Sequence, residues 1–273
     1  MKKTMNLALL CAFCCFSLVF AQNRTTLEEK YRQAMAVLVI SGSSQSDRDG
    51  ALNQLQFAAE QNYVPAQTAL GTYYSHAGFA PRDMTKAVDW FSKAADHGDW
   101  IAQLALGRIY FAGDGVPQDS SRARQWLFRA AESGDGVAAF YLGLLNDGRM
   151  GAATDYAEAA RWYRQSAEAG NPYAQEKLAN LLLKGQGVAR DPKEAYAWLL
   201  VAAETGNSGA ALRLGSLDGD LGQTAAKATR ENALELHHQI LTRKSKNPCN
   251  GWPGQYDMRP VPPPLSYLSV CEK

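Results

Sequence analysis

The chain repeats itself every 36 residues over most of its length, and this period constrains the fold more than any other feature. Tryptophan recurs at Trp90, Trp126, Trp162 and Trp198. Alanine, glycine and aspartate recur at the same spacing, in columns that begin at Ala66, Gly98 and Asp47. A fixed period of about 20–50 residues is typical of repeat proteins, in which each unit contacts mainly its neighbours. The period therefore predicts a stack of similar units and excludes a fold built around one central core.

The unit from Ala102 to Ala138 predicts two helices joined by a turn. Apolar residues at helical spacing indicate the first helix, namely Ala102, Leu106, Ile109 and Tyr110. Gly113 and Gly115 allow the positive φ angles of a helix end, and Asp119 is the expected N-cap of a second helix. The second helix carries the apolar set Ala123, Trp126, Leu127, Ala130 and Ala131 and ends at Gly134. The unit is therefore a pair of antiparallel helices of about 13 residues each.

The tryptophan column has two interpretations. Trp126 shares its helical stripe with Ala123 and Ala130, which favours a core position beside small residues that let two backbones approach. Truncation of such a residue to Ala would cost about 3–5 kcal/mol. The column could instead be an exposed aromatic ladder that binds a ligand. Both interpretations remain open at the level of sequence.

Charge and motifs exclude several functional classes. Lys and Arg number 28 against 27 for Asp and Glu, so the chain lacks the basic excess that nucleic-acid binding requires. No hydrolase, metalloprotease or phosphate-loop motif is present in the sequence. The adjacent His237 and His238 point about 100° apart on a helix and fit a solvated surface better than a metal site. We expect no catalytic residue, cofactor or metal.

The N-terminus predicts export. Lys2 and Lys3 precede an apolar run from Leu7 to Phe20, and Ala21 suits signal cleavage, so residues 1–21 are interpreted as a signal peptide. Retention of the run as an anchor is the alternative. No later stretch is apolar enough to span a bilayer, so the mature chain is expected to have no membrane span and to be periplasmic or secreted.

The C-terminal residues 246–273 differ in character from the repeats. They are rich in proline and hold Cys249 and Cys271, which are the cysteines left after signal removal. In an exported chain such a pair predicts one disulfide, here closing an extended tail. The tail could cap the last repeat, stay disordered or fold back as a regulatory segment, and these alternatives stay open.

The repeat letters resemble those of the SEL-1-like repeat family, a branch of the tetratricopeptide-type solenoids. The resemblance rests on Ala102 to Gly107, on the turns Gly113–Val116 and Gly185–Val188, and on the Trp, Ala and Gly columns. Asn146 in place of Tyr110 and Ala179 in place of Gly107 depart from the pattern. The resemblance implies an all-α fold, a right-handed α/α superhelical solenoid over residues 28–245. It has about five to six repeats, near 30–65, 66–101, 102–137, 138–173, 174–209 and, in part, 210–245.

The same resemblance implies a non-enzymatic module that binds an unidentified protein or peptide on its concave face. An immunity protein that neutralises a secreted toxic effector is one alternative. A penicillin-binding or β-lactamase enzyme is another, but such relatives carry a disulfide in each repeat, and this chain has no cysteine between Gln22 and Pro248. Hydrolysis of a chromogenic β-lactam by the purified protein would test that alternative.

The resemblance also places the concave stripe at three residues before, and one and four after, the glycine of each Leu-Gly pair. We therefore expect partner-binding residues at Thr72, His76, Leu104, Arg108, Phe111, Phe140, Leu144, Asp147, Glu176 and Asn180. Aromatic and arginine anchors ringed by polar residues are typical of binding hot spots. Phe111 and Phe140 could instead pack between repeats, and Trp100 is a further candidate for an exposed aromatic.

Overall fold

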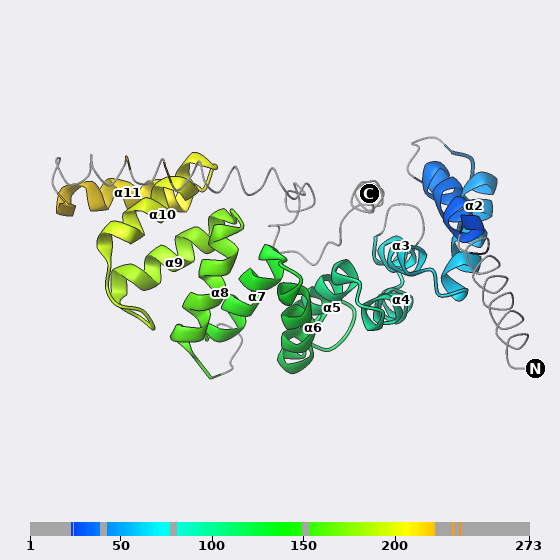
Figure 1. Cartoon of the computed structure of the whole chain (residues 1–273), viewed down its shortest axis with the longest axis horizontal. Helices are drawn as coiled ribbons and strands as arrows, with labels where there is room; N and C mark the ends of the chain where they lie inside the picture. The colour runs from blue at the N-terminus through cyan, green and yellow to red at the C-terminus, as the bar shows by residue number, and fades with distance from the viewer. Residues whose placement is uncertain are drawn as a thin grey trace, which may run out of the picture. The chain divides into compact units, whose positions relative to one another are not determined.

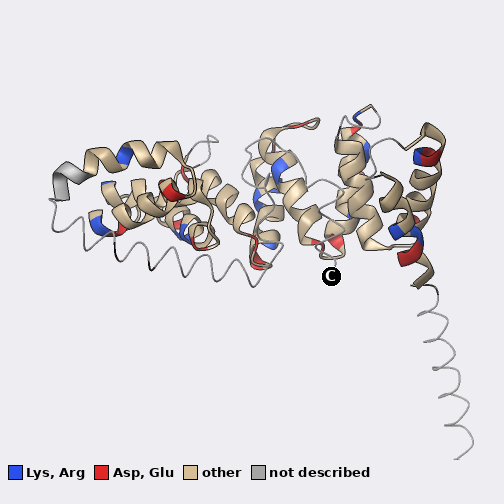
Figure 2. Cartoon of the chain, turned by 90° about the horizontal axis from the view of Figure 1, so that it is seen from above, with Lys and Arg blue, Asp and Glu red and all other residues tan. Residues whose placement is uncertain are grey.

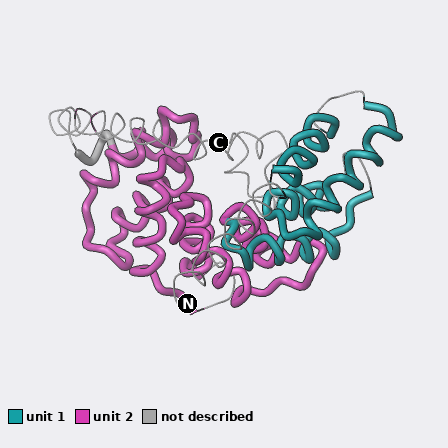
Figure 3. Tube along the Cα trace, turned by 45° about the vertical axis from the view of Figure 1, so that its right-hand side comes forward, with its two compact units in different colours: residues 1–99, 264–273 teal, residues 100–263 magenta. Residues whose placement is uncertain are grey.

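The computed structural model describes residues 25–38, 43–76, 81–148 and 153–221, together with the single residues 23, 231 and 235. The predicted signal peptide, the proline-rich tail and the Cys249–Cys271 pair lie outside these residues. The chain divides into two compact units, one with the described residues up to Asp99 (unit 1) and the other with those from Trp100 onward (unit 2; Figure 3).

The described residues are helical, with no strand among them (Figure 1). Residues 25–38 form a helix at the start of unit 1. Unit 1 continues with α2 (Gln45–Glu60), α3 (Val64–Ser75) and α4 (Met84–Asp96). Unit 2 holds α5 (Trp100–Ala112), α6 (Ser120–Glu132), α7 (Gly136–Asn146), α8 (Tyr156–Glu168), α9 (Pro172–Lys184), α10 (Pro192–Glu204) and α11 (Ser208–Leu221). The fold is thus an all-α solenoid of helix pairs on the 36-residue period.

We call α3, α5, α7, α9 and α11 the first helices and α2, α4, α6, α8 and α10 the second helices of their repeats. Each first helix from α3 to α9 packs most extensively against the second helix that follows it. The packing centres on the glycine of the Leu-Gly pair. A Cβ built on Gly71, Gly107 or Gly143 would approach the side chain of Phe91, Leu127 or Tyr163 to 2.5, 2.5 and 2.4 Å. These three contacts leave no room for a side chain at Gly71, Gly107 or Gly143, whereas the fifth repeat has Ala179 at the equivalent position.

The contact residue of the second helix is therefore the one after each tryptophan. Phe91, Leu127, Tyr163 and Leu199 are at most 1% exposed. Among the tryptophans, Trp162 and Trp198 are buried, as the core interpretation predicts, but Trp90 and Trp126 are only half-buried. Lys93 lies 3.8 Å from the Trp90 ring centre and Arg129 lies 4.9 Å from that of Trp126. A cation therefore lies over one face of each of these two rings.

The aspartate column caps the second helices. The side chains of Asp83, Asp119, Asp155 and Asp191 each accept a hydrogen bond from a backbone N–H in the first turn of α4, α6, α8 or α10. The backbone N–H of each donates in turn to a carbonyl of the preceding first helix, as Asp119 does to Tyr110 at 2.9 Å. Asp47 is an exception, because α2 begins earlier. Ser44 caps α2, and Asp47 completes a capping box from within its first turn.

The glycine column ends the second helices. Gly98, Gly134, Gly170 and Gly206 have φ between 85° and 94°, a region that L-residues with side chains rarely enter. In the first repeat Asn62 takes this place, with φ of 60°. Asn tolerates the left-handed region better than other residues because its short amide can bond locally, which explains the substitution.

Candidate interaction surface on the first helices

The structure places half of the predicted partner-binding residues in the interior. Thr72, Leu104, Arg108, Phe140 and Leu144 are at most 7% exposed. His76, Phe111, Asp147, Glu176 and Asn180 are half-buried. A buried side chain has no surface to offer a partner, so the expected stripe is not one continuous binding face, and the five buried residues are withdrawn from it.

The first row of the stripe lies at the joint between repeats. Thr68 donates to the Asp99 carboxylate, which lies just before the next first helix in the chain. At the corresponding joint of unit 2, Asn207 Nδ2 donates to Glu176 Oε2 at 3.1 Å. Leu104 and Phe140 occupy the same column as Thr68 and Glu176. Residues three positions before the glycine therefore hold consecutive repeats together.

Phe140 and Phe111 belong to a run of aromatic rings through unit 2. The ring centre of Tyr141 lies 5.0 Å from that of Phe111 and 6.0 Å from that of Phe140. The Phe140 ring also lies 6.0 Å from Tyr163 and 6.4 Å from Tyr173. These distances suit edge-to-face and tilted ring contacts. Phe140 packs between repeats, which is the alternative that the sequence left open, and only the two ends of the run, Phe111 and Tyr173, reach solvent.

Arg108 is buried beside an unusual carboxylate. Its guanidinium lies 5.6 Å from the Tyr141 ring centre, and the residue is 2% exposed. Asp135, the N-cap of α7, accepts from the Ala138 N–H at 2.6 Å. Burial raises the pKa of Asp135 to about 6, although the N–H donors of Ala138 and Val137 and the charge of Arg108 oppose the rise. Arg108 therefore acts inside the joint and is not a surface anchor.

One face of α9 stays accessible, and it combines an aromatic with polar groups. Tyr173, Glu176 and Asn180 lie at i, i+3 and i+7, which is one side of a helix. Tyr173 is 44% exposed and is one of the few large hydrophobic side chains so exposed in the described chain. Arg213 of α11 lies 3.9 Å from the Glu176 carboxylate. The Oδ1 atom of Asn180 is shielded from solvent yet accepts no hydrogen bond. We call Tyr173, Glu176, Asn180 and Arg213 the α9 face.

The remaining predicted residues have local partners. His76 Nδ1 lies 2.9 Å from the Thr72 carbonyl oxygen in unit 1. Asp147 accepts from the Tyr163 hydroxyl at 2.7 Å in unit 2. Trp100 is half-buried at the start of α5. Tyr173 was not expected from the sequence, because it stands outside the stripe, in the column that also holds the buried Ile101 and Val137. An aromatic at the start of a first helix was the available signal.

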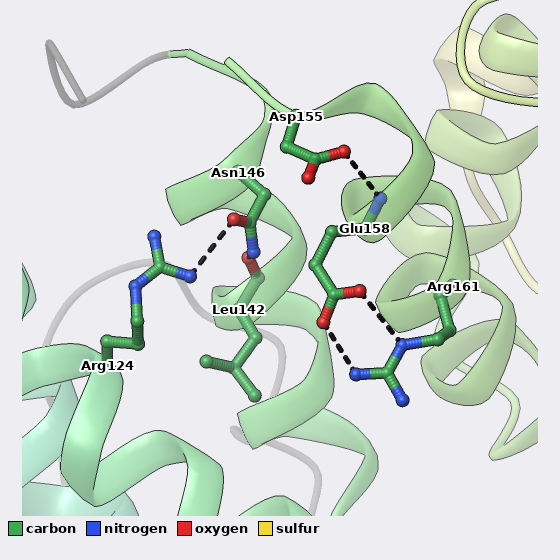
Figure 4. Close-up of polar contacts among 6 residues, drawn as sticks. All are labelled: Arg124, Leu142, Asn146, Asp155, Glu158 and Arg161. Atoms are coloured by element: carbon green, nitrogen blue, oxygen red, sulfur yellow. Dashed lines mark hydrogen bonds and ion pairs between the residues drawn. The ribbon is translucent and has the colours of Figure 1, made fainter. Parts of the chain in front are cut away.

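The fourth repeat departs from the repeat pattern at Asn146, and Figure 4 shows the polar contacts of this residue and of its neighbours. Asn146 stands where Tyr110 stands one repeat earlier. It accepts from Arg124 Nη1 of α6 at 3.0 Å and donates to the Leu142 carbonyl at 2.8 Å. Close by, Glu158 holds Arg161 through two hydrogen bonds. Asn146 bonds both a neighbouring helix and its own backbone within unit 2, so this departure has a structural role.

The described residues also bear on chemistry and membranes. They contain no group of three His, Cys, Asp or Glu side chains that could hold a metal ion. Within the same part of the chain, no helix has both the length and the apolar character needed to cross a bilayer. Among the described residues, acidic and basic positions are interspersed along the helices (Figure 2).

The family model of the Sel1 repeat matches residues 64–99, 100–135, 136–171 and 172–207, which is more than half of the chain. This chain belongs to the Sel1 repeat family. The family boundaries fall at the starts of the first helices α3, α5, α7 and α9. Sel1 repeats are in general non-catalytic scaffolds that bind proteins. Among curated protein sequences, none matches this Sel1 repeat chain significantly.

Solved structures with the same repeat agree with the fold. A Sel1 repeat protein from Oxalobacter formigenes shares 33% identity over 68% of this chain and 78% of its own, with a TM-score of 0.57. The protein c5321, a protective antigen present in uropathogenic Escherichia coli strains, shares 28% identity with a TM-score of 0.69. That match covers 84% of this Sel1 repeat chain but 48% of c5321, so the chain spans about half of that protein's length.

Proposed function

We propose that this Sel1 repeat protein binds another protein or a peptide through the α9 face, outside the cytoplasm. The observation that carries the proposal is the exposed ring of Tyr173, which is backed by the aromatic run and flanked by Glu176, Asn180 and Arg213. Binding hot spots combine a large amphipathic aromatic with arginine and polar neighbours that exclude water.

The packing behind Tyr173 favours this role. Its ring rests against Phe140, which is itself fixed by Tyr141 and Tyr163. A tyrosine has few rotatable bonds and presents an apolar body with a polar end, so it gives contact area at low entropic cost.

The test is affinity capture with a variant of the α9 face. The Tyr173→Ser, Asn180→Ala double variant is expected to recover the native partner at least about ten-fold less well than the wild type, since hot-spot truncations cost roughly 2 kcal/mol or more. Phe128 provides a matched control. It is 43% exposed against 44% for Tyr173, but it lies on the second helix α6 against Trp162.

The Phe128→Ser variant is expected to capture the partner as the wild type does. Partners are captured from the cell envelope and quantified by mass spectrometry, and circular dichroism verifies that each variant is folded. Equal capture by both variants, or loss with Phe128→Ser alone, would contradict a site on the α9 face.

Export is part of the proposal and rests on the sequence of residues 1–21. Cell fractionation and N-terminal sequencing are expected to find the mature chain outside the cytoplasm and beginning at Gln22. A cytoplasmic chain that retains Met1 would contradict it. Within the class of binding modules, capture of a toxin encoded by the same genome would assign the chain as an immunity protein.

A further inference from the structure

The exposed side of α11, the last helix that the structure describes, does not have the composition of a solenoid end. Ala211, Leu212, Gly215 and Ser216 lie on one side of this helix, and all four are exposed. Leu212 alone is 80% exposed. The terminal repeat of a solenoid needs a polar outer face to stay soluble. These four residues include a leucine and no charge, so the packed structure is expected to continue past Leu221.

The same positions are buried in the earlier repeats. Leu212 belongs to a column with members that are at most 7% exposed, namely Thr68, Leu104 and Phe140. Gly215 belongs to a column in which a Cβ would meet a second-helix side chain at 2.4–2.5 Å, namely that of Gly71, Gly107 and Gly143. Among the described residues, nothing lies within 4 Å of the Cβ position of Gly215. The described part of the chain therefore leaves open the space that a second helix fills elsewhere.

The chain continues from α11 with enough residues to fill this space. One period after α10, a second helix of the sixth repeat would occupy residues 228–240. Its connection to α11 would be residues 222–227, which is close in length to the connections 113–119 and 185–191 of the earlier repeats. The segment that follows α11 in the sequence is therefore long enough to pack against it.

This segment cannot use the columns that pack against the first helix in other repeats. Ala195 and Leu199 of α10 are buried, but Glu231 and Glu235 stand one period later. Both glutamates are helical and exposed. A carboxylate is costly to remove from water, so a helix that packs against the uncharged side of α11 has to present a different side.

An apolar side of this kind is present in the sequence. Ala233, Leu236 and Ile240 lie at i, i+3 and i+7, which is one side of a helix. With about 100° per residue, Ile240 lies about 180° from Glu231 and about 140° from Glu235. The segment thus combines an apolar side with a charged one, as the end of a solenoid requires.

We propose that residues 228–241 are the terminal cap of this Sel1 repeat solenoid. They form a helix that packs Ala233, Leu236 and Ile240 against the exposed side of α11 and turns Glu231 and Glu235 to solvent. This helix takes the place of a second helix in the sixth repeat, rotated by about half a turn relative to the earlier ones. The proline-rich residues 246–273 are then not the cap. The proposal does not depend on the function of the α9 face.

Amide hydrogen exchange of the full chain, followed by mass spectrometry, tests the contact away from the substituted residue. Ile240→Asp places a charge on the apolar side of the proposed cap. It is expected to speed the exchange of the α11 amides at least about ten-fold, because a terminal helix that loses its cover opens locally.

Thr242→Asp is the matched control. It introduces the same residue two positions later, about 20° from Glu231 on the charged side of the proposed helix. It is expected to leave the exchange of α11 unchanged. The amides of α7, inside unit 2, are expected to exchange equally in both variants and in the wild type, which verifies that the earlier repeats stay folded.

A photo-reactive residue at position 212 of the full chain identifies what covers α11. Cross-linking within one chain to residues 228–241 supports the proposal. Cross-linking to residues 246–273, or to a second copy of the chain, would overturn it in favour of a capping tail or a homodimer. Equal exchange of α11 in the two aspartate variants, or the absence of any cross-link to residues 228–241, would overturn it as well.

Discussion

The glycine that separates the helices of a repeat gives the sharpest test of how this solenoid is held together. We predict that Gly143→Ala destabilises the protein, although Ala is the better helix former by about 1 kcal/mol. The added Cβ would lie 2.4 Å from Cε1 and 2.5 Å from Cδ1 of Tyr163. Carbon atoms in contact are separated by about 3.5–4.0 Å, so the ring must move by roughly 1 Å.

The Tyr163 ring has little freedom to move. It is 1% exposed, it lies 6.0 Å from the Phe140 ring, and its hydroxyl donates to Asp147 at 2.7 Å. Overpacking of a fixed core residue costs about 1–3 kcal/mol, and strain in the hydroxyl contact adds about 0.5–1.5. After the gain in helix propensity, we expect a net loss of roughly 1–3 kcal/mol.

Urea unfolding followed by circular dichroism measures the loss. With a slope of about 2 kcal/mol per molar, the midpoint is expected to fall by roughly 1 M. Gly50→Ala is the control. Gly50 is exposed within α2, and nothing lies within 4 Å of its Cβ position, so this variant is expected to gain about 0.5–1 kcal/mol. If Gly143→Ala is as stable as the wild type, close packing at this column is not what selects glycine.

Two further changes test the joints between repeats. Burial raises the pKa of Asp135 to about 6, above its value in the unfolded chain, so the stability that its protonated form contributes is present below about pH 4 and is lost as pH rises through 6. This pH-dependent share of the free energy of unfolding is about 3 kcal/mol for roughly two pKa units, and it is expected to vanish in Asp135→Asn. Urea midpoints between pH 4 and 7 measure it. An unchanged pH dependence in the variant would exclude this carboxyl as its source. Gln165→Ala removes a hydrogen bond to the Ala131 carbonyl and is expected to cost about 1 kcal/mol in urea unfolding. Adding Ala139→Gln is expected to restore part of the loss, because Gln67 and Gln175 supply the equivalent bond in their repeats, and no recovery would contradict the equivalence.

Most of the fold was predictable because it depends on residues that recur. The 36-residue period set the number and order of the helices, and the capping aspartates and terminal glycines set where each second helix begins and ends. These devices are local, since a cap or a positive φ involves only a few neighbouring residues. The start of α2 was the exception, because Ser44 and Asp47 form a capping box that moves the helix boundary away from the column.

The candidate surface was harder to predict, because exposure depends on neighbours that the repeat pattern does not describe. Thr72, Arg108 and Leu144 share one column, and all three are buried, whereas Asn180 in the same column is half-buried. The tryptophans behave in the same way, since Trp90 and Trp198 share a column but only Trp198 is buried. Periodicity thus identifies which side of a helix a residue occupies, but the size and charge of the adjacent repeat decide whether that side meets solvent.

The non-repeated residues at the joints also explain how a chain of similar units folds in one order. The joints carry different polar contacts: Thr68 bonds Asp99, Arg108 lies beside Asp135, and Glu176 accepts from Asn207. Suppose that two repeats paired out of order, so that Asp135 met Leu144, the residue equivalent to Arg108 in the next repeat. The buried carboxyl would then lose its neighbouring cation, and the charged form of such a group is costly without a donor or a cation. The buried contacts at the joints, among them Arg108 beside Asp135, therefore oppose the exchange of one repeat for another.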